Sequence, residues 1–205
     1  YYPYNADVRN FNYPVQLAAQ ERGSTACDLL YAATKEEYTY SPENEPHISL
    51  NFTHRLAKVI LKFVNMEKEP LEVSDVRIEG MQTAASFNIQ TDVLTVDESS
   101  VATINPYHNA TTGFYEAIIL PSALTDSYKV SFVLDDREKE WIFTNLDIAL
   151  PQFHKGYSYT FALYIDDSGF VEMGRLENVE GGNSSAPWED GSSEDGTAEG
   201  DKTPV

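Results

Sequence analysis

Short apolar segments separated by turn residues fill the middle of the chain, from His47 to about Asp166. The segments YKVSFVL (128–134) and YSYTFALYI (157–165) alternate two faces and are rich in β-branched and aromatic residues, as half-buried strands are. No amphipathic pattern of three helical turns interrupts the series. The pattern predicts strands near residues 47–55, 58–64, 73–79, 84–90, 93–96, 101–104, 114–120, 128–134, 140–146 and 157–165. Such a series is typical of an all-β, antiparallel β-sandwich.

The two ends of the chain differ from this middle part. The segment SPENEP (41–46) is polar, acidic and bracketed by prolines, which suits a linker. We therefore expect residues 1–46 to be the remnant of an N-terminal domain with its linker, and residues 47–176 to be a complete C-terminal domain. Residues 177–205 form an acidic tail rich in Gly and Ser. The chain has no initiator Met or apolar leader, and we expect it to be part of a longer precursor.

The segment NFTHRLAKVILKFVN (51–65) fits two interpretations. A helix would give it an apolar stripe made of Phe52, Leu56, Val59, Ile60 and Phe63. A strand would place alternate residues on one inward face, beginning with Ile48, Leu50, Phe52, His54 and Leu56. A one-residue slip after Ala57, as in a β-bulge, would then keep Val59, Leu61 and Phe63 inward and turn Lys58 and Lys62 to water. Periodicity does not decide between them, but the β-branched and aromatic composition favours the strand.

His54 is the one residue of this segment with catalytic potential. On the strand interpretation it faces inward between Phe52 and Leu56. No Ser or Cys nucleophile motif accompanies it, and no second His lies at a spacing suited to a metal. A single inward histidine of this kind is more often a satisfied core residue than a base or ligand. We expect His54 to be buried and non-catalytic.

Composition excludes several classes of function. The 205 residues are 41% hydrophobic, with thirteen Tyr and ten Phe, which is enough apolar surface for a core. The formal net charge of −19 repels nucleic-acid backbones and anionic lipids. No run of eighteen apolar residues is present, so we expect no transmembrane segment. Cys27 is the only cysteine, cannot form an internal disulfide, and is expected to be a small buried hydrophobe.

The acidic segments suggest metal binding or catalysis, but their spacing supports neither. The segment WEDGSSEDGTAEGD (188–201) has acids and glycines, but its spacing does not fit a calcium-binding EF-hand loop. The segment DDREKE (135–140) is expected to be a charged hairpin turn rather than a carboxylate pair in a pocket. The sequence therefore predicts no catalytic residues, no metal site and no cofactor.

A family resemblance adds what these patterns do not show. The segment LNFTHRLAKVILKF resembles the F-x-H-x-L-A-K-V motif of fimbrillin-like proteins, which are surface pilus subunits of anaerobic Gram-negative gut and oral bacteria. The matching residues are Phe52, His54, Leu56, Ala57 and Lys58. Four further segments resemble family elements in the family's order: YYPYN, DLLYAAT, FHKGYSYTFALYID and APWEDG. The family's lipoprotein signal, lipobox cysteine and first N-terminal strands have no counterpart in these residues.

The resemblance implies a transthyretin-like β-sandwich and a structural role. Such a protein is a shaft, tip or anchor subunit of a fimbria on the outer membrane, made as a secreted lipoprotein precursor, and it supports adhesion without being an enzyme. Its partners are other fimbrial subunits, joined by strand donation, and a ligand on a host or bacterial surface. Residues 177–205 are the candidate donor. Within them Trp188 either anchors a terminal strand on its own sandwich or inserts into a neighbouring subunit.

A second function fits the same composition. A surface glycan-binding β-sandwich lipoprotein would also be acidic and rich in aromatic residues. Its sugar platforms would be Tyr107, Tyr115 or Trp141.

Overall fold

The computed structural model describes residues 1, 3–20, 27–34, 48–66, 71–134, 137–143, 150–166, 171–177 and 186–187. In these residues the regular structure is entirely β. The strands are β1 (Asn12–Gln16), β2 (Leu30–Tyr31), β3 (Thr53–His54), β4 (Ala57–Asn65), β5 (Val73–Glu79), β6 (Ala84–Asn88), β7 (Val93–Val96), β8 (Tyr107–Asn109), β9 (Phe114–Ile119), β10 (Ser122–Ala123), β11 (Lys129–Leu134), β12 (Arg137–Ile142), β13 (Gln152–Phe153), β14 (Tyr157–Ile165), β15 (Val171–Glu177) and β16 (Ala186–Pro187).

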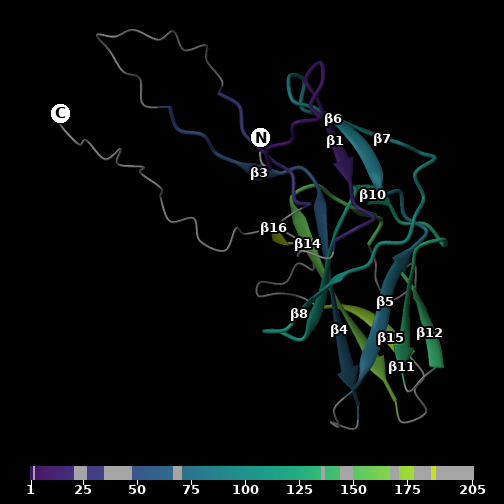
Figure 1. Ribbon diagram of the computed structural model, residues 1–205. Coiled ribbons are helices and arrows are strands. Elements are labelled where there is room, and N and C mark those ends of the chain that lie inside the picture. Colours follow the sequence, from purple (N-terminus) through teal and green to yellow (C-terminus); the bar gives the residue numbers. More distant parts are fainter. Residues whose placement is uncertain are drawn as a thin grey trace, which may run out of the picture.

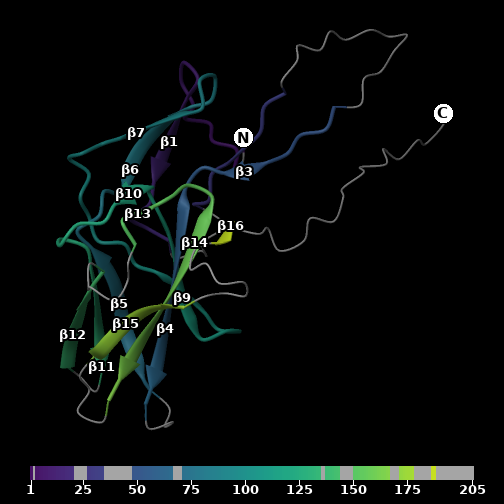
Figure 2. The ribbon, with the colours of Figure 1, turned by 180° about the vertical axis from the view of Figure 1, so that it is seen from behind.

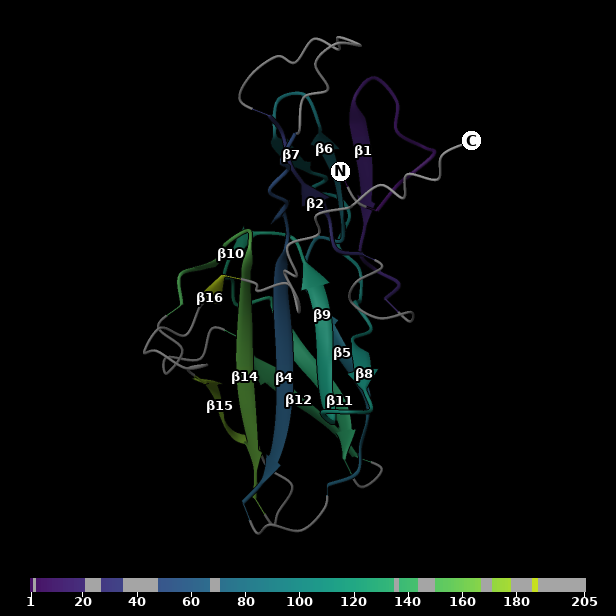
Figure 3. The same ribbon diagram turned by 90° about the vertical axis from the view of Figure 1, so that its left-hand side faces the viewer.

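Two sheets face each other and form a sandwich (Figure 3). One sheet has the order β15-β14-β4-β9-β8, with β16 also paired to β14, and the other has the order β12-β11-β5. The predicted antiparallel β-sandwich is confirmed, with one exception: β4 and β14 pair in parallel, from Ser158 beside Lys58 to Ile165 beside Asn65. Both are long, largely apolar strands, as expected for strands at the centre of a sheet. The finer, transthyretin-like topology stays a prediction.

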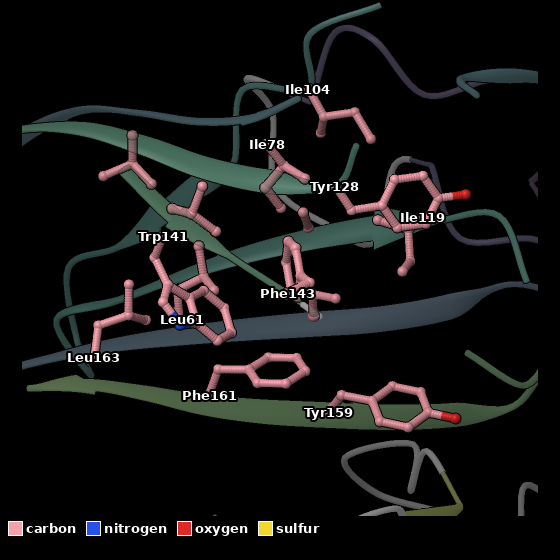
Figure 4. Packing of buried hydrophobic residues seen from close by; sticks show 14 of the residues in the cluster. Leu61, Ile78, Ile104, Ile119, Tyr128, Trp141, Phe143, Tyr159, Phe161 and Leu163 are labelled. Carbon is pink, nitrogen blue, oxygen red and sulfur yellow. The ribbon is translucent and has the colours of Figure 1, made fainter. Parts of the chain in front are cut away.

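The main hydrophobic core lies between these two sheets (Figure 4). Its aromatic centre joins Trp141 and Phe143 to Phe161 of β14, with ring centroids 5.0 to 5.4 Å apart. Leu61 and Leu163 project into it from the adjacent strands β4 and β14. This packing explains why these two strands carry apolar residues at alternate positions.

A third sheet, in the order β1-β6-β7, stands at one end of the sandwich (Figure 1). It covers a second hydrophobic cluster, whose buried members are Tyr13, Val15, Leu17, Leu29, Leu56, Ala85, Phe87, Ile118 and Leu120. Residues before position 46 thus share a core with β6 and β7. The domain boundaries at residues 46 and 176 stay a prediction.

The 51–65 segment is a strand where it runs as β4, and not a helix. Leu56 and Ala57 are consecutive and both fully buried, which locates the one-residue slip. Leu56 packs into the second cluster, whereas Ala57 begins the face that packs into the main core. Because of the slip, this one segment contributes buried side chains to both hydrophobic clusters.

The prediction was wrong for the residues before this slip. Residues 48–52 are not a strand, and Ile48, Leu50 and Phe52 are 46%, 48% and 42% exposed. Their alternation is correct for a strand, but no other part of the described chain pairs with them. An extended segment without a neighbouring strand has no sheet face to bury.

Candidate functional site

His54 lies at the end of β3 and forms a buried, hydrogen-bonded side-chain pair with Asp28. Its Nδ1 is 2.8 Å from Oδ2 and 3.0 Å from Oδ1 of Asp28, and His54 is 6% exposed. The pair joins the segment before β2 to β3, beside the backbone bond that Arg55 N–H donates to the carbonyl of Leu29 at 2.8 Å. Two chain segments are thereby fixed at the base of the sheet β1-β6-β7.

Cys27 adjoins this pair but lacks the properties of a nucleophile. Burial raises the pKa of its thiol, and the nearby Asp28 carboxylate raises it further. A reactive cysteine requires the opposite shift, toward the thiolate. The Asp28–His54 pair has no activated nucleophile beside it in the described chain, and its arrangement suits a structural role.

Lys58 does not face open water as predicted. Its Nζ lies 2.6 Å from Oε2 of Glu116 on the neighbouring strand β9, and both side chains are largely buried. Asn109 of β8 donates a hydrogen bond of 2.9 Å to Oε1 of the same carboxylate. Lys62, four residues further along β4 and on the same face, has its Nζ 5.4 Å from the ring centre of Phe114. The two lysines thus tie three strands together on the outer face of the sheet.

The side chain of Gln20 bonds backbone groups of β9 that no neighbouring strand reaches. Strand β8 pairs with β9 only as far as Glu116, so the outward backbone groups of Ile118 have no strand beside them. The Gln20 side chain, 2% exposed, donates from Nε2 to the carbonyl of Ile118 at 2.6 Å and accepts from its N–H at 2.8 Å. The same Nε2 donates to the carbonyl of Leu17 at 2.9 Å. The sequence pattern did not reveal this role, because the partners are 98 residues apart.

The three proposed sugar platforms occupy different environments. Trp141 is 4% exposed in the main core, which excludes it as a platform. Tyr115 is half-buried, stacks on His108 with ring centroids 4.6 Å apart, and donates a hydrogen bond of 2.8 Å to the carbonyl of Val73. It lines a pocket of about 360 Å³, together with Phe63, Asn65, Leu71, Glu72, Val73, His108 and Gly113. Tyr107 is half-buried and lies outside that lining.

The described residues contain no group of three or more His, Cys, Asp or Glu side chains that could hold a metal ion. They also contain no helix suited to crossing a lipid bilayer. Trp188 and the acidic segment that follows it lie outside the described residues. Of the tail, the structure describes β16, where Pro187 and Ala186 pair with Tyr157 and Ser158 of β14.

Comparison with known proteins finds solved structures that share this fold. A candidate cell adhesion protein from Bacteroides uniformis has a TM-score of 0.74 at 22% identity, covering 92% of this chain and 71% of that protein. Another, from Bacteroides ovatus, has a TM-score of 0.66 at 16% identity, with coverages of 92% and 66%. At these identities the likeness shows a shared fold. No curated protein matches the sequence.

The family model described as fimbrillin-like matches residues 1–188, which is most of the chain. This confirms the resemblance that rests on the motif around His54. The chain belongs to the fimbrillin-like family.

Proposed function

We propose that this chain is a structural, non-enzymatic subunit of a fimbria at the cell surface. The observation that carries the proposal is the fimbrillin-like match over residues 1–188. Two structures of the same fold come from candidate cell adhesion proteins, which agrees with a role in adhesion. Attachment to the outer membrane through a lipoprotein precursor, and a position as shaft, tip or anchor, are finer parts of the same proposal.

Strand donation is the proposed mode of assembly. The C-terminal segment already returns to β14 as the two-residue strand β16, beside the longer strand β15. A two-residue pairing makes few hydrogen bonds, so little free energy opposes its replacement by the same segment of another subunit. Trp188 directly follows β16 and would supply an aromatic anchor in the acceptor. Residues 177–205 are therefore the proposed donor.

Deletion of residues 178–205 tests this mode of assembly. The shortened chain should remain folded, with Trp141 in its buried environment, and electron microscopy should find no fibres on cells that make it. A shorter deletion of residues 189–205, which retains β16 and Trp188, should leave fibres in place and serves as the control. Undiminished polymerisation of the chain that ends at 177 would end the idea of a C-terminal donor.

Glycan binding is the second candidate, and the pocket beside Tyr115 is the observation that favours it. The pocket combines the rings of Phe63 and His108 with the polar side chains of Asn65 and Glu72, a combination suited to a sugar. A glycan array with the folded monomer separates the two functions. Binding that disappears on Glu72→Ala would favour the lectin, whereas a shaft subunit should bind nothing on the array.

A further inference from the structure

Residues 48–52 have the pattern of a strand but pair with nothing in the described chain. Their apolar side chains, Ile48, Leu50 and Phe52, are all more than two-fifths exposed, and the alternate positions Ser49 and Asn51 are polar and exposed too. None of their backbone groups bonds to the backbone of another described residue. A segment of high strand propensity without a partner in its own chain is a ready template for pairing with another chain.

The segment is held in place at its C-terminal end. Thr53 and His54 pair with β2, and Arg55 Nε lies 2.7 Å from Oδ1 of Asp92. From this fixed base the ribbon of residues 48–52 runs away from the sheets, as Figures 1 and 2 show from opposite sides. A segment that is anchored at one end loses less conformational entropy on binding than a free one.

Two sheet edges of the molecule are poorly suited to accept it. Just beyond the two ends of β1, Leu17 N–H donates to the carbonyl of Thr83, and the carbonyl of Phe11 accepts from Ile89 N–H. The odd-numbered residues of β1 therefore bond to β6. Pro14 is therefore one of the residues turned to the free edge, where it offers no N–H. In β12 the edge is charged, with Arg137, Glu138, Lys139 and Glu140 in succession. Proline and charge are the usual protections against edge pairing.

The edge of β7 has neither protection. Asp97 N–H donates to the carbonyl of Ala84. Because backbone hydrogen bonds alternate along an antiparallel strand, the backbone groups of Thr95 and Val93 also bond to β6, whereas those of Leu94 and Val96 point to the free edge. No described residue bonds to these outward groups. The side chains of Leu94 and Val96 lie at the margin of the second hydrophobic cluster and are only partly buried. The edge is thus uncharged, free of proline and incompletely covered.

We propose that residues 48–52 of one copy add as a strand to the free edge of β7 in a second copy. Ile48, Leu50 and Phe52 then cover the exposed margin of Leu94 and Val96, and the polar positions lie with Thr95 on the other face. The two surfaces are different, so the contact is heterologous and leaves each copy able to bind a further copy, as a filament requires. The choice of a second copy as partner rests on the proposed fimbrial function, and this contact is distinct from the C-terminal donor.

Disulfide trapping between two different variants tests the contact. The variants Asn51→Cys and Thr95→Cys are made in full-length chains that carry Cys27→Ser. After mixing and mild oxidation, an intermolecular disulfide should form between them, and neither variant alone should dimerise. In a second pairing, Ser49→Cys is mixed with Thr95→Cys in place of Asn51→Cys, which tests whether the added strand is shifted by two residues along β7. Gln16→Cys is the matched control. It lies on the edge of β1, which Pro14 protects from pairing, and it should give no dimer with Asn51→Cys.

A second measurement ties the trapping to the apolar side chains. Leu50→Asn should lower the yield of trapped dimer by about tenfold, the change expected when one apolar anchor is lost. Ile142→Asn changes a residue that is 47% exposed on β12 and should have no effect. Three results would overturn the contact. They are equal dimer yields with Gln16→Cys and Thr95→Cys, no dimer with either Asn51→Cys or Ser49→Cys, and an unchanged dimer yield in Leu50→Asn. If the unmodified chain is found on no filament of the cells that make it, the fimbrial function itself fails, whatever the trapping shows.

Discussion

Replacing Gln20 with leucine removes three hydrogen bonds from the interior while nearly preserving the volume of the side chain. The amide nitrogen donates to the carbonyls of Leu17 and Ile118, and the amide oxygen accepts from the N–H of Ile118. After the substitution all three backbone groups remain buried, and a leucine side chain cannot bond to them. The segment that ends at Gln20 also loses its bonded connection to β9.

The size of the effect follows from these three groups. An intramolecular hydrogen bond contributes about 1 kcal/mol net, and a buried group left without a partner costs about 1–3 kcal/mol. The N–H of Ile118 carries most of the penalty, because each carbonyl has a second lone pair and tolerates the loss better. The better packing of leucine offsets a part. We expect a decrease of about 3 kcal/mol in the free energy of unfolding.

Urea unfolding followed by tryptophan fluorescence, to which the buried Trp141 contributes, measures this change. With a slope of about 2–3 kcal/mol per molar urea, the midpoint should fall by about 1 M. Gln16→Leu is the matched control, because Gln16 is exposed and its substitution should change stability by less than about 0.5 kcal/mol. Equal midpoints for the two variants would refute the reasoning that the Gln20 amide replaces a strand.

Substitutions at two glycines, and at His54 and its partner Asp28, have defined outcomes. Gly80 has φ = +87°, and a Cβ there would lie 2.0 Å from the carbonyl oxygen of Ser127, so Gly80→Ala should cost more than about 3 kcal/mol. Gly113 has φ = +74° with open space around it, so Gly113→Ala should cost only about 1 kcal/mol, and equal melting temperatures would contradict the steric argument. His54→Ala should destabilise the fold by about 3 kcal/mol, because it leaves the buried Asp28 side chain without this hydrogen-bond partner. Asp28→Ala together with His54→Ala should restore part of that loss in a double-mutant cycle, and simple additivity of the two losses would argue against the pair.

Several strands were predicted with nearly the observed bounds: β5, β7 and β14 match the predicted ranges, and β4 is longer by one residue at each end. Strands β4 and β14 carry β-branched and aromatic residues in a nearly continuous run, and their predicted and observed bounds agree closely. Their parallel pairing could not be predicted, because nothing local distinguishes parallel from antiparallel neighbours in a buried strand. Strand β1 was not among the predicted strands; it contains Pro14, and it lies at a sheet edge, where a proline is tolerated.

The candidate site was predicted in part. The inward direction of His54 followed from its alternation with Leu56, and both residues are buried. Its partner Asp28 lies 26 residues away in a segment without clear periodicity, so the pair was not foreseen. Phe52 shares the same alternation and is nevertheless exposed, because burial also requires a facing layer, and the sequence pattern does not report whether one is present.

Immunogold electron microscopy of cells that naturally make this protein tests the central claim most directly. An antibody against the folded chain should label filaments that extend from the cell surface, and the label should disappear from filaments when the gene is deleted. Periodic label along a filament would indicate a shaft subunit, and label at one end would indicate a tip or anchor. Label spread over the cell envelope without any filament, or label confined to the cell interior, would contradict the assignment of this chain as a fimbrial subunit.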